Sequence, residues 1–223
     1  MTVSTPDRWR RRAQALANIS WWDAVFFVGV LVVGAIRFSI LRSGGAPPTI
    51  DSGNWLAFAD SMLGNGARSS SIVYPPVVPL LASAFAAVFG LVDGISLLGS
   101  LAAAMPAIGI YAALRYLRLG LGALVPGLLL LGARSVGEAT AWGGFPQLIG
   151  FGLTPIVLVA VDRWLRSWSS GIALIAGSLF ALVMAVSHFV ALTVALAIVA
   201  MGLLALISPI GAVRDWRKGV KSL

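Results

Sequence analysis

The sequence predicts an all-α polytopic membrane protein with six or seven transmembrane helices. Of its 223 residues, 59% are hydrophobic and only 11% are charged, and the mean hydropathy is +0.94. The apolar residues fall into runs that approach the roughly 20 residues that a membrane-spanning helix needs. Basic residues cluster directly before the first run and after the last one, as cytoplasmic anchors do. Together these features indicate one membrane domain without a sizeable soluble domain.

Composition also excludes several kinds of chemistry. The chain has no cysteine, which rules out disulfides, thiolate metal ligands and a cysteine nucleophile. One histidine and eight acidic residues leave few titratable candidates. The formal net charge of +8 comes largely from clusters at residues 8–12 and 214–221. Because these clusters flank the spans, we interpret them as contacts to anionic membrane lipid and expect no nucleic-acid partner.

The chain divides into a basic cytoplasmic arm (1–20), a transmembrane module (21–208) and a basic tail (209–223). Residues 22–41 form the first predicted span, which begins at a tryptophan pair suited to the membrane interface. No small-residue cleavage site comes after this run, so we interpret it as a retained span. Arg37 lies near its outer end, where the long side chain is expected to snorkel toward the interface.

Residues 42–76 form the first predicted extracytoplasmic loop. Within it, apolar residues at positions 56, 59, 62 and 63 share one face of a helix, which predicts a juxtamembrane helix in the plane of the membrane surface. Pro75 and Pro76 fix the backbone at the end of the loop, so a second helix is expected to begin through Pro76.

The next apolar segment, residues 77–92, leaves two topologies open. If it crosses the membrane, the protein has seven spans and an external C-terminus. If it only dips into the membrane, the protein has six spans and both termini are cytoplasmic. In the second case twelve of the 16 basic residues are cytoplasmic, four each in the arm, the helix ends and the tail. The positive-inside rule therefore favours six spans.

The later spans are predicted at residues 95–114, 119–133, 148–161, 171–186 and 189–208. Residues 134–147 are expected to form an outer loop, and Ser187 and His188 an outer turn. Small residues along the spans predict close helix packing; they are Gly99, Ala103, Gly150, Gly171 and Gly177. This topology brings a set of polar residues to the outer face: Asp51, Tyr74, Glu138, Gln147 and His188.

Asp51 is the strongest candidate for a catalytic residue. It lies within a few residues of the end of the first span and precedes a glycine and a tryptophan. A carboxylate at the membrane surface can act as a general base, and partial burial would raise its pKa toward a useful range. Alternatively, Asp51 caps the helix that begins at Ser52, since aspartate is a favoured N-cap residue.

An aspartate after the first span and the Tyr74-Pro75-Pro76 element before a later helix resemble the first extracytoplasmic loop of the GT-C glycosyltransferases. These polytopic enzymes take a sugar from a polyprenyl-phosphate carrier. The resemblance implies a glycosyltransferase of the cytoplasmic membrane with an extracytoplasmic active face, in which Asp51 is the base. It also implies that Glu138 and His188 assist the acceptor, although each also fits an ordinary loop or cap residue. A divalent metal bound by Asp51, Glu138 and His188 is a weaker expectation, and no metal ligands are assigned.

Substrate binding would require cations near the donor's phosphate. The outer candidates are Arg68 and Arg134, with Arg42 behind them, because a guanidinium suits bidentate phosphate contact; each also fits an interfacial anchor. Tyr74 stands where some relatives have lysine or histidine, so it can donate only a neutral hydrogen bond.

The Trp142-Gly143-Gly144-Phe145-Pro146-Gln147 segment resembles the segment before an inward span in some GT-C-like proteins. There, Trp142 and Gln147 would line a sugar or lipid pocket, and the glycines would permit close approach. The alternative is an interfacial aromatic before a helix start with proline in its first turn.

Two other classes remain as alternatives. A transporter or lipid flippase would need polar or ionisable residues at mid-membrane, and the spans are nearly devoid of charge. A non-catalytic membrane scaffold or partner subunit would have the same composition. The chain covers the family's N-terminal module and little more, so it could be a truncated product, a minimal enzyme or one half of a two-part system with a C-terminal partner.

Overall fold

The computed structural model describes residues 20–43, 49–64 and 75–207, and all of its regular elements are α-helices. The predicted all-α class is therefore confirmed for these residues. Arg68 and Tyr74, most of the basic arm, and the basic tail lie outside them. The helices are α2 (Trp21–Arg42), α3 (Ser52–Met62), α4 (Val77–Phe89), α5 (Leu91–Tyr116), α6 (Leu121–Leu131), α7 (Arg134–Ala141), α8 (Phe145–Ser167), α9 (Ser170–Val186) and α10 (His188–Ile207).

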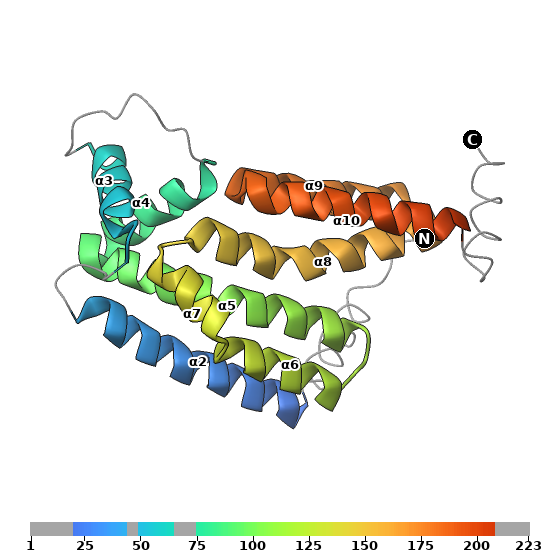
Figure 1. Ribbon diagram of the computed structural model, residues 1–223, viewed down its shortest axis with the longest axis horizontal. Helices are drawn as coiled ribbons and strands as arrows, with labels where there is room; N and C mark the ends of the chain where they lie inside the picture. The colour runs from blue at the N-terminus through green and yellow to red at the C-terminus, as the bar shows by residue number, and fades with distance from the viewer. Residues whose placement is uncertain (1–19, 44–48, 65–74, 208–223) are drawn as a thin grey trace, which may run out of the picture.

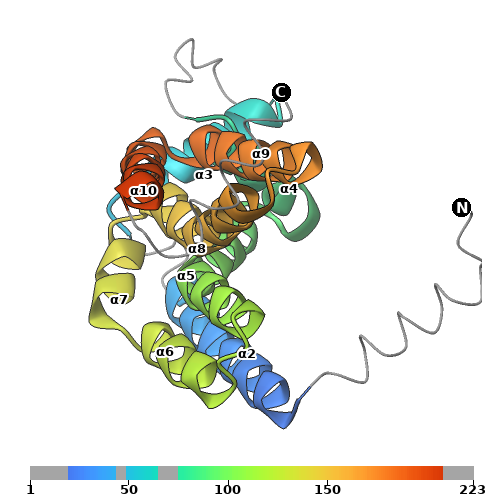
Figure 2. The ribbon, with the colours of Figure 1, turned by 90° about the vertical axis from the view of Figure 1, so that its right-hand side faces the viewer.

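The long helices lie side by side along the longest axis of the molecule, and α3 lies across one end (Figure 1). Helices α5 and α8 occupy the middle, with α2 and α6 on one side and α9 and α10 on the other (Figure 2). Successive long helices are antiparallel, so the bundle has two ends. Asp23, at the start of α2, contacts Arg115 near the end of α5. We call this the Asp23 end and the opposite one, which carries α3, the Asp51 end.

Four helices are long and apolar enough to cross a membrane: α2, α5, α8 and the His188–Ala205 part of α10. Helices α6 and α7, bent by 41° at a short break, would make a fifth crossing if the pair is a single span. Helices α4 and α9 are apolar but shorter. The exposed surface of α2 is largely hydrophobic, including Leu31 at 72% exposure, as expected of a helix that faces lipid. These properties fit a multi-pass membrane protein.

Residues 134–147 were expected to form an outer loop, but they contain the eight-residue helix α7. Its sequence is too polar to indicate a span, yet Val136 and Thr140, four residues apart, are both buried against the bundle. On its exposed side Arg134 pairs with Glu138, also four residues apart. The helix therefore depends on tertiary burial of one narrow face.

Arg37 does not snorkel outward as predicted. Its guanidinium donates hydrogen bonds to the carbonyl oxygens of Ala103 in α5, at 3.2 Å, and Leu131 at the end of α6, at 2.7 Å. The reason is geometric. Side chains on a helix tilt toward its N-terminus, which for α2 is the Asp23 end, so Arg37 extends toward the middle of the bundle, where these carbonyls lie.

Small residues bring several helices together. A Cβ atom on Gly99 would lie 2.8 Å from the ring of Phe145, and one on Gly150 would lie 3.1 Å from the side chain of Val190. These two positions behave as predicted. Gly177 does not, because nothing lies within 4 Å of a Cβ placed there.

The tightest contact lies between α5 and α8. A Cβ on Gly109 would overlap the backbone carbonyl of Gly152, and a Cβ on Gly152 would lie 2.5 Å from the carbonyl oxygen of Met105. Backbone therefore packs directly on backbone at this crossing, which only glycine permits.

Replacing Gly109 with alanine should separate α5 from α8 and destabilise the protein by about 1–3 kcal/mol, the usual cost of overpacking. Gly177→Ala is the matched control, because its methyl group enters open space and alanine is the better helix former. Thermal unfolding in detergent should show a lower Tm for the first variant only. Equal Tm values for the two variants would contradict the assigned crossing.

Candidate functional site

The segment around Asp51 is docked on the turn between α7 and α8. The backbone amides of Ile50 and Asp51 donate hydrogen bonds to the carbonyls of Ala141 and Trp142, at 3.1 and 3.2 Å. One turn into α3, the indole N–H of Trp55 donates to the carbonyl of Gly143 at 2.9 Å. Two segments that the sequence separates by some 90 positions are thus joined by three hydrogen bonds.

Gly143 makes this close approach possible. Its φ of +78° lies in the left-handed region that favours glycine. A Cβ at this position would lie 2.8 Å from the Cβ of Asp51 and 3.1 Å from the indole nitrogen of Trp55. Both the positive φ and the lack of room for a Cβ atom therefore require glycine at position 143.

Two buried aromatic rings pack together next to the docked segment. Trp55 and Phe145 are both almost fully buried, and their rings stack with centroids 5.8 Å apart and planes inclined by 22°. Phe145 is the first residue of α8, and Pro146 lies in its first turn, so the predicted helix start is confirmed. The burial of these rings anchors α3 to the start of α8.

The carboxylate of Asp51 does not cap α3. Asp51 occupies the N-cap position, but its side chain makes no capping hydrogen bond to the helix. Oδ1 accepts a hydrogen bond from the side-chain amide of Asn54 at 3.3 Å, and the residue is partly exposed. The side chain of Trp142, 65% exposed, belongs to the turn on which Asp51 docks. Asp51 thus presents a partly exposed carboxylate on a backbone that is hydrogen-bonded to this turn.

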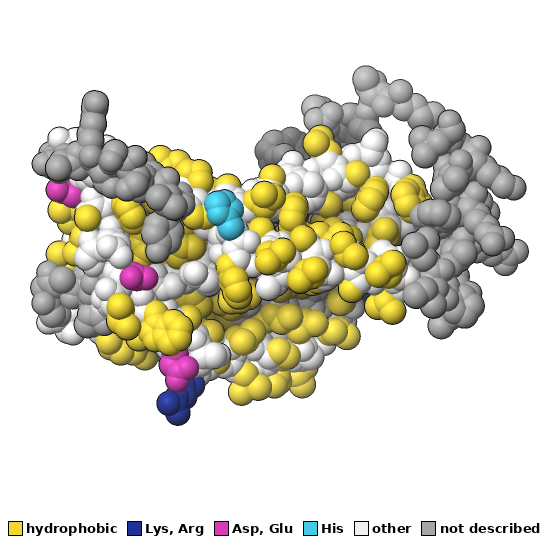
Figure 3. Space-filling model, turned by 45° about the horizontal axis from the view of Figure 1, so that its top comes forward, with side chains coloured by type: hydrophobic (Ala, Val, Ile, Leu, Met, Phe, Trp, Pro, Cys, Tyr) yellow, Lys and Arg dark blue, Asp and Glu magenta, His cyan; other side chains and the backbone are white. Residues whose placement is uncertain are grey.

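The other predicted catalytic residues, Glu138 and His188, lie in α7 and at the start of α10. Glu138 pairs with Arg134 at 2.8 Å, and the two side chains are 56% and 93% exposed. His188 is exposed at the start of α10. On the face shown in Figure 3, the visible acidic side chains and the histidine lie toward the Asp51 end, and many hydrophobic side chains lie over α9 and α10. Within the described residues, no three His, Asp or Glu side chains form a group that could hold a metal ion, so the suggested metal ligands are not brought together.

Gln147 lies in the first turn of α8. Its Oε1 atom is buried and accepts no hydrogen bond from the residues that the structure describes. A Cβ on Gly144 would lie 3.4 Å from this oxygen, so Gln147 faces back toward the turn that receives Asp51. Of the predicted substrate-binding residues, Trp142 and Gln147 are therefore near Asp51 in the fold, whereas Arg68 and Tyr74 lie outside the described residues.

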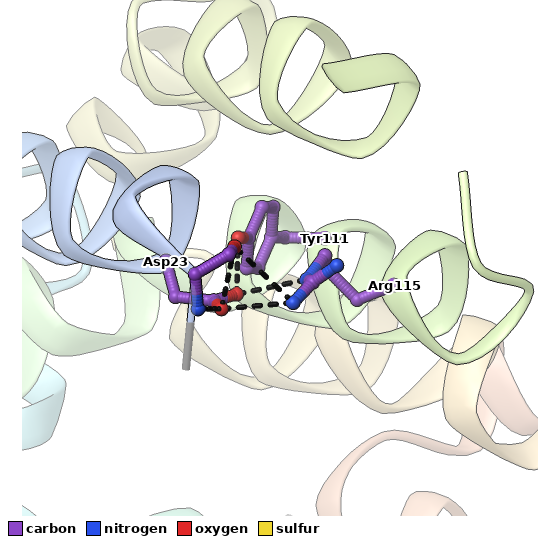
Figure 4. Close-up of polar contacts among 4 residues, drawn as sticks. Asp23, Tyr111 and Arg115 are labelled. Carbon is purple, nitrogen blue, oxygen red and sulfur yellow. Dashed lines mark hydrogen bonds and ion pairs between the residues drawn. The ribbon is translucent and has the colours of Figure 1, made fainter. Parts of the chain in front are cut away.

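A second polar cluster, at the Asp23 end, was not predicted (Figure 4). The guanidinium of Arg115 donates two hydrogen bonds to Asp23, from Nε to Oδ1 and from Nη2 to Oδ2, each at 2.8 Å. The hydroxyl of Tyr111 donates to Asp23 Oδ1 at 2.6 Å, and the backbone and side chain of Ser20 both donate to Oδ2. Tyr111 and Arg115 are four residues apart and therefore share one face of α5, a spacing from which a polar cluster could have been predicted.

This cluster fixes structure and leaves little room for chemistry. Both oxygens of Asp23 already accept at least two hydrogen bonds, and its side chain is only 13% exposed. A fully engaged carboxylate has no lone pair left to take a proton from a substrate. We therefore interpret the cluster as a clamp between α2 and α5.

Comparison of the chain with known proteins adds no identification to this geometry: no family model, no curated protein and no solved structure matches it.

Replacing Gly143 with alanine should loosen the docked segment. The left-handed conformation costs a residue with a Cβ about 1–2 kcal/mol, and the methyl group would crowd Asp51. Hydrogen exchange detected by mass spectrometry should show faster exchange of the amides at residues 50 and 51. Gly137→Ala, on open α7 surface, is the control and should leave exchange unchanged. Unchanged protection in both variants would argue against the docking.

Breaking the Asp23 clamp should cost far more than breaking an exposed ion pair. Asp23→Ala leaves the partly buried Arg115 without its carboxylate, and we expect a loss of about 2–3 kcal/mol in the free energy of unfolding. Asp162→Ala removes the exposed i,i+4 partner of Arg166 and should cost about 0.3–0.5 kcal/mol. Denaturant titration in mixed micelles measures both, and similar losses would refute the clamp.

Proposed function

We propose that this chain is a GT-C-like glycosyltransferase module that moves a sugar from a polyprenyl-phosphate carrier to an extracytoplasmic acceptor. The observation that carries the proposal is the Asp51 carboxylate. Its backbone is fixed by hydrogen bonds to the α7–α8 turn, yet its side chain neither caps α3 nor forms an ion pair with any described residue. A carboxylate whose backbone is fixed, and whose oxygens are not engaged in a cap or an ion pair, is suited to act as a general base.

The proposed reaction is a direct displacement at the anomeric carbon. The acceptor's hydroxyl oxygen forms the new glycosidic bond while the bond from that carbon to the phosphate oxygen breaks. Asp51 takes the hydroxyl proton, and the polyprenyl phosphate leaves with the bonding electron pair. Cations are needed where negative charge grows on the phosphate. Arg134 is suited to this, because an exposed pair such as Arg134–Glu138 is held weakly and can exchange partners; Arg68 is the second candidate.

The proposed topology has six spans, built on α2, α5, α6, α8, α9 and α10, in a cell membrane of the envelope. Helices α3, α4 and α7 then lie at the outer surface, with both termini in the cytoplasm. Described arginines at the Asp23 end support this orientation; they are Arg115, Arg118, Arg163 and Arg166. Toward the Asp51 end the described residues include only Arg42 and Arg134, two arginines against four, so basic residues are more numerous at the Asp23 end.

Reporter fusions after Leu91 and after Leu117 test this topology. With six spans, the fusion after Leu91 should report an external location and the fusion after Leu117 a cytoplasmic one. With seven spans both signals reverse. A cytoplasmic signal after Leu91 would therefore overturn the six-span proposal.

One observation favours a second candidate, a non-catalytic scaffold or partner subunit. The described cations nearest the Asp51 end, Arg42 and Arg134, already have carboxylate partners at 2.7 and 2.8 Å. A protein that never binds phosphate would show the same pairs. The two candidates differ in whether a lipid phosphate binds.

Thermal unfolding in detergent with polyprenyl phosphate, and with neutral polyprenol as the control, separates them. A ligand that binds only the folded protein stabilises it, by about 2.7 kcal/mol at one hundred times its Kd. We expect a higher Tm with the phosphate alone and a smaller shift in Arg134→Gln and Arg68→Gln. Asp51→Asn should keep the shift but abolish transfer, whereas Asp60→Asn, in the helix α3 that follows Asp51, should keep both. No shift with either lipid would favour the scaffold.

A further inference from the structure

Arg37 is a charged side chain inside one of the candidate membrane spans, and its partners are backbone carbonyls. It donates to Leu131 at 2.7 Å and to Ala103 at 3.2 Å, and no carboxylate of the described residues lies within ion-pair distance. Leu131 is the last residue of α6. Its carbonyl belongs to the end of the helix that carries partial negative charge, which compensates the guanidinium in part.

The depth of this contact distinguishes it from an interfacial anchor. Ala103 lies at the midpoint of the 26-residue helix α5, well away from either end of the bundle. An arginine that anchored α2 to the membrane surface would extend in the opposite direction. Charged residues at such depth are rare and are kept where they serve a specific contact.

The contact lies at the break between α6 and α7. Helix α6 stops at Leu131 and α7 begins at Arg134, and their axes differ by 41°. A helix that ends in an apolar environment leaves its last carbonyls without intrahelical donors, which is costly where water is scarce. Arg37 supplies a donor to the final carbonyl and joins it to the middle of α5.

From this break the chain leads directly to the candidate site. Helix α7 runs from the end of α6 to the start of α8 (Figure 1). It ends at Ala141, and the carbonyls of residues 141–143 accept the hydrogen bonds that hold Ile50, Asp51 and Trp55. The direction in which α7 leaves the break therefore decides where those carbonyls lie.

We propose that Arg37 is a positioning residue: by binding the end of α6 to α5, it sets the bend into α7 and so places the turn at residues 141–143 against Asp51. The role is conformational and does not depend on the chemistry proposed for Asp51. It holds equally if the protein is a scaffold.

The absence of native cysteines permits a direct test with spin labels. Ala57→Cys in α3 and Gly137→Cys in α7 are exposed positions, so a label pair there reports the distance across the docked segment. Leu117→Cys and Ser167→Cys, exposed at the Asp23 end, form a control pair. Both pairs are measured in the full chain in detergent with Arg37 intact, with Arg37→Gln and with Arg37→Lys.

We expect Arg37→Gln to lose the single narrow α3–α7 distance while the control pair keeps its own. Arg37→Lys, which retains a charged donor for one carbonyl, should restore most of the narrow distribution. An unchanged α3–α7 distance in Arg37→Gln would overturn the proposal, as would equal broadening of both pairs, which would make Arg37 a general stability element. If Arg37→Gln cannot be purified, Arg37→Met, which has no donor for either carbonyl, is measured in its place: broadening of the α3–α7 pair alone supports the proposal, and no broadening overturns it.

Discussion

The direct backbone contact between α5 and α8 is the interaction on which the rest of the bundle depends. At Gly109 and Gly152 the two helices approach until main-chain atoms touch, which no residue with a Cβ would allow. The remaining long helices then pack on this central pair from two sides (Figure 2). Because α8 begins at the turn that receives Asp51, its close seating on α5 also fixes that turn relative to α2.

The carboxylates of Asp23 and Asp51, at opposite ends of the bundle, are used in different ways. At the Asp23 end, carboxylate, guanidinium, phenol and serine satisfy one another, and the cluster ties α2 to α5. At the Asp51 end, the backbone makes the connection, and the carboxylate has a single long contact among the described residues, from Asn54. A group that the fold does not need for its own stability is free to serve a substrate, and this contrast directs the functional proposal to Asp51.

Arg37 shows how a broken helix can be accommodated within an apolar bundle. The α6–α7 bend exposes carbonyl groups that neither lipid nor aliphatic side chains can satisfy. The guanidinium of Arg37, from the neighbouring helix α2, supplies the missing donor, and the negative end of the α6 dipole compensates its charge in part. The same residue that makes the break tolerable therefore also constrains the direction in which α7 leaves it.

The sequence by itself determined the helical class, the membrane character and most helix positions. Long apolar runs, the proline pair before α4 and the Ser187 turn before α10 are local signals that need no tertiary context. It also singled out Asp51 and the Trp142–Gln147 segment as notable. The sequence did not predict α7. That helix buries only Val136 and Thr140, and its residues, which include glycine, serine, valine and threonine, have a weak intrinsic helix propensity.

Only the tertiary structure decided which of these segments meet. The hydrogen bond from Trp55 to Gly143 joins residues 88 positions apart, and no local pattern encodes such a pairing. The direction of Arg37 likewise depends on the orientation of α2 against the ends of α5 and α6, which the position of a charge near a span end cannot supply. Local chemistry fixes what each segment can form, whereas burial against distant segments fixes where its polar groups go.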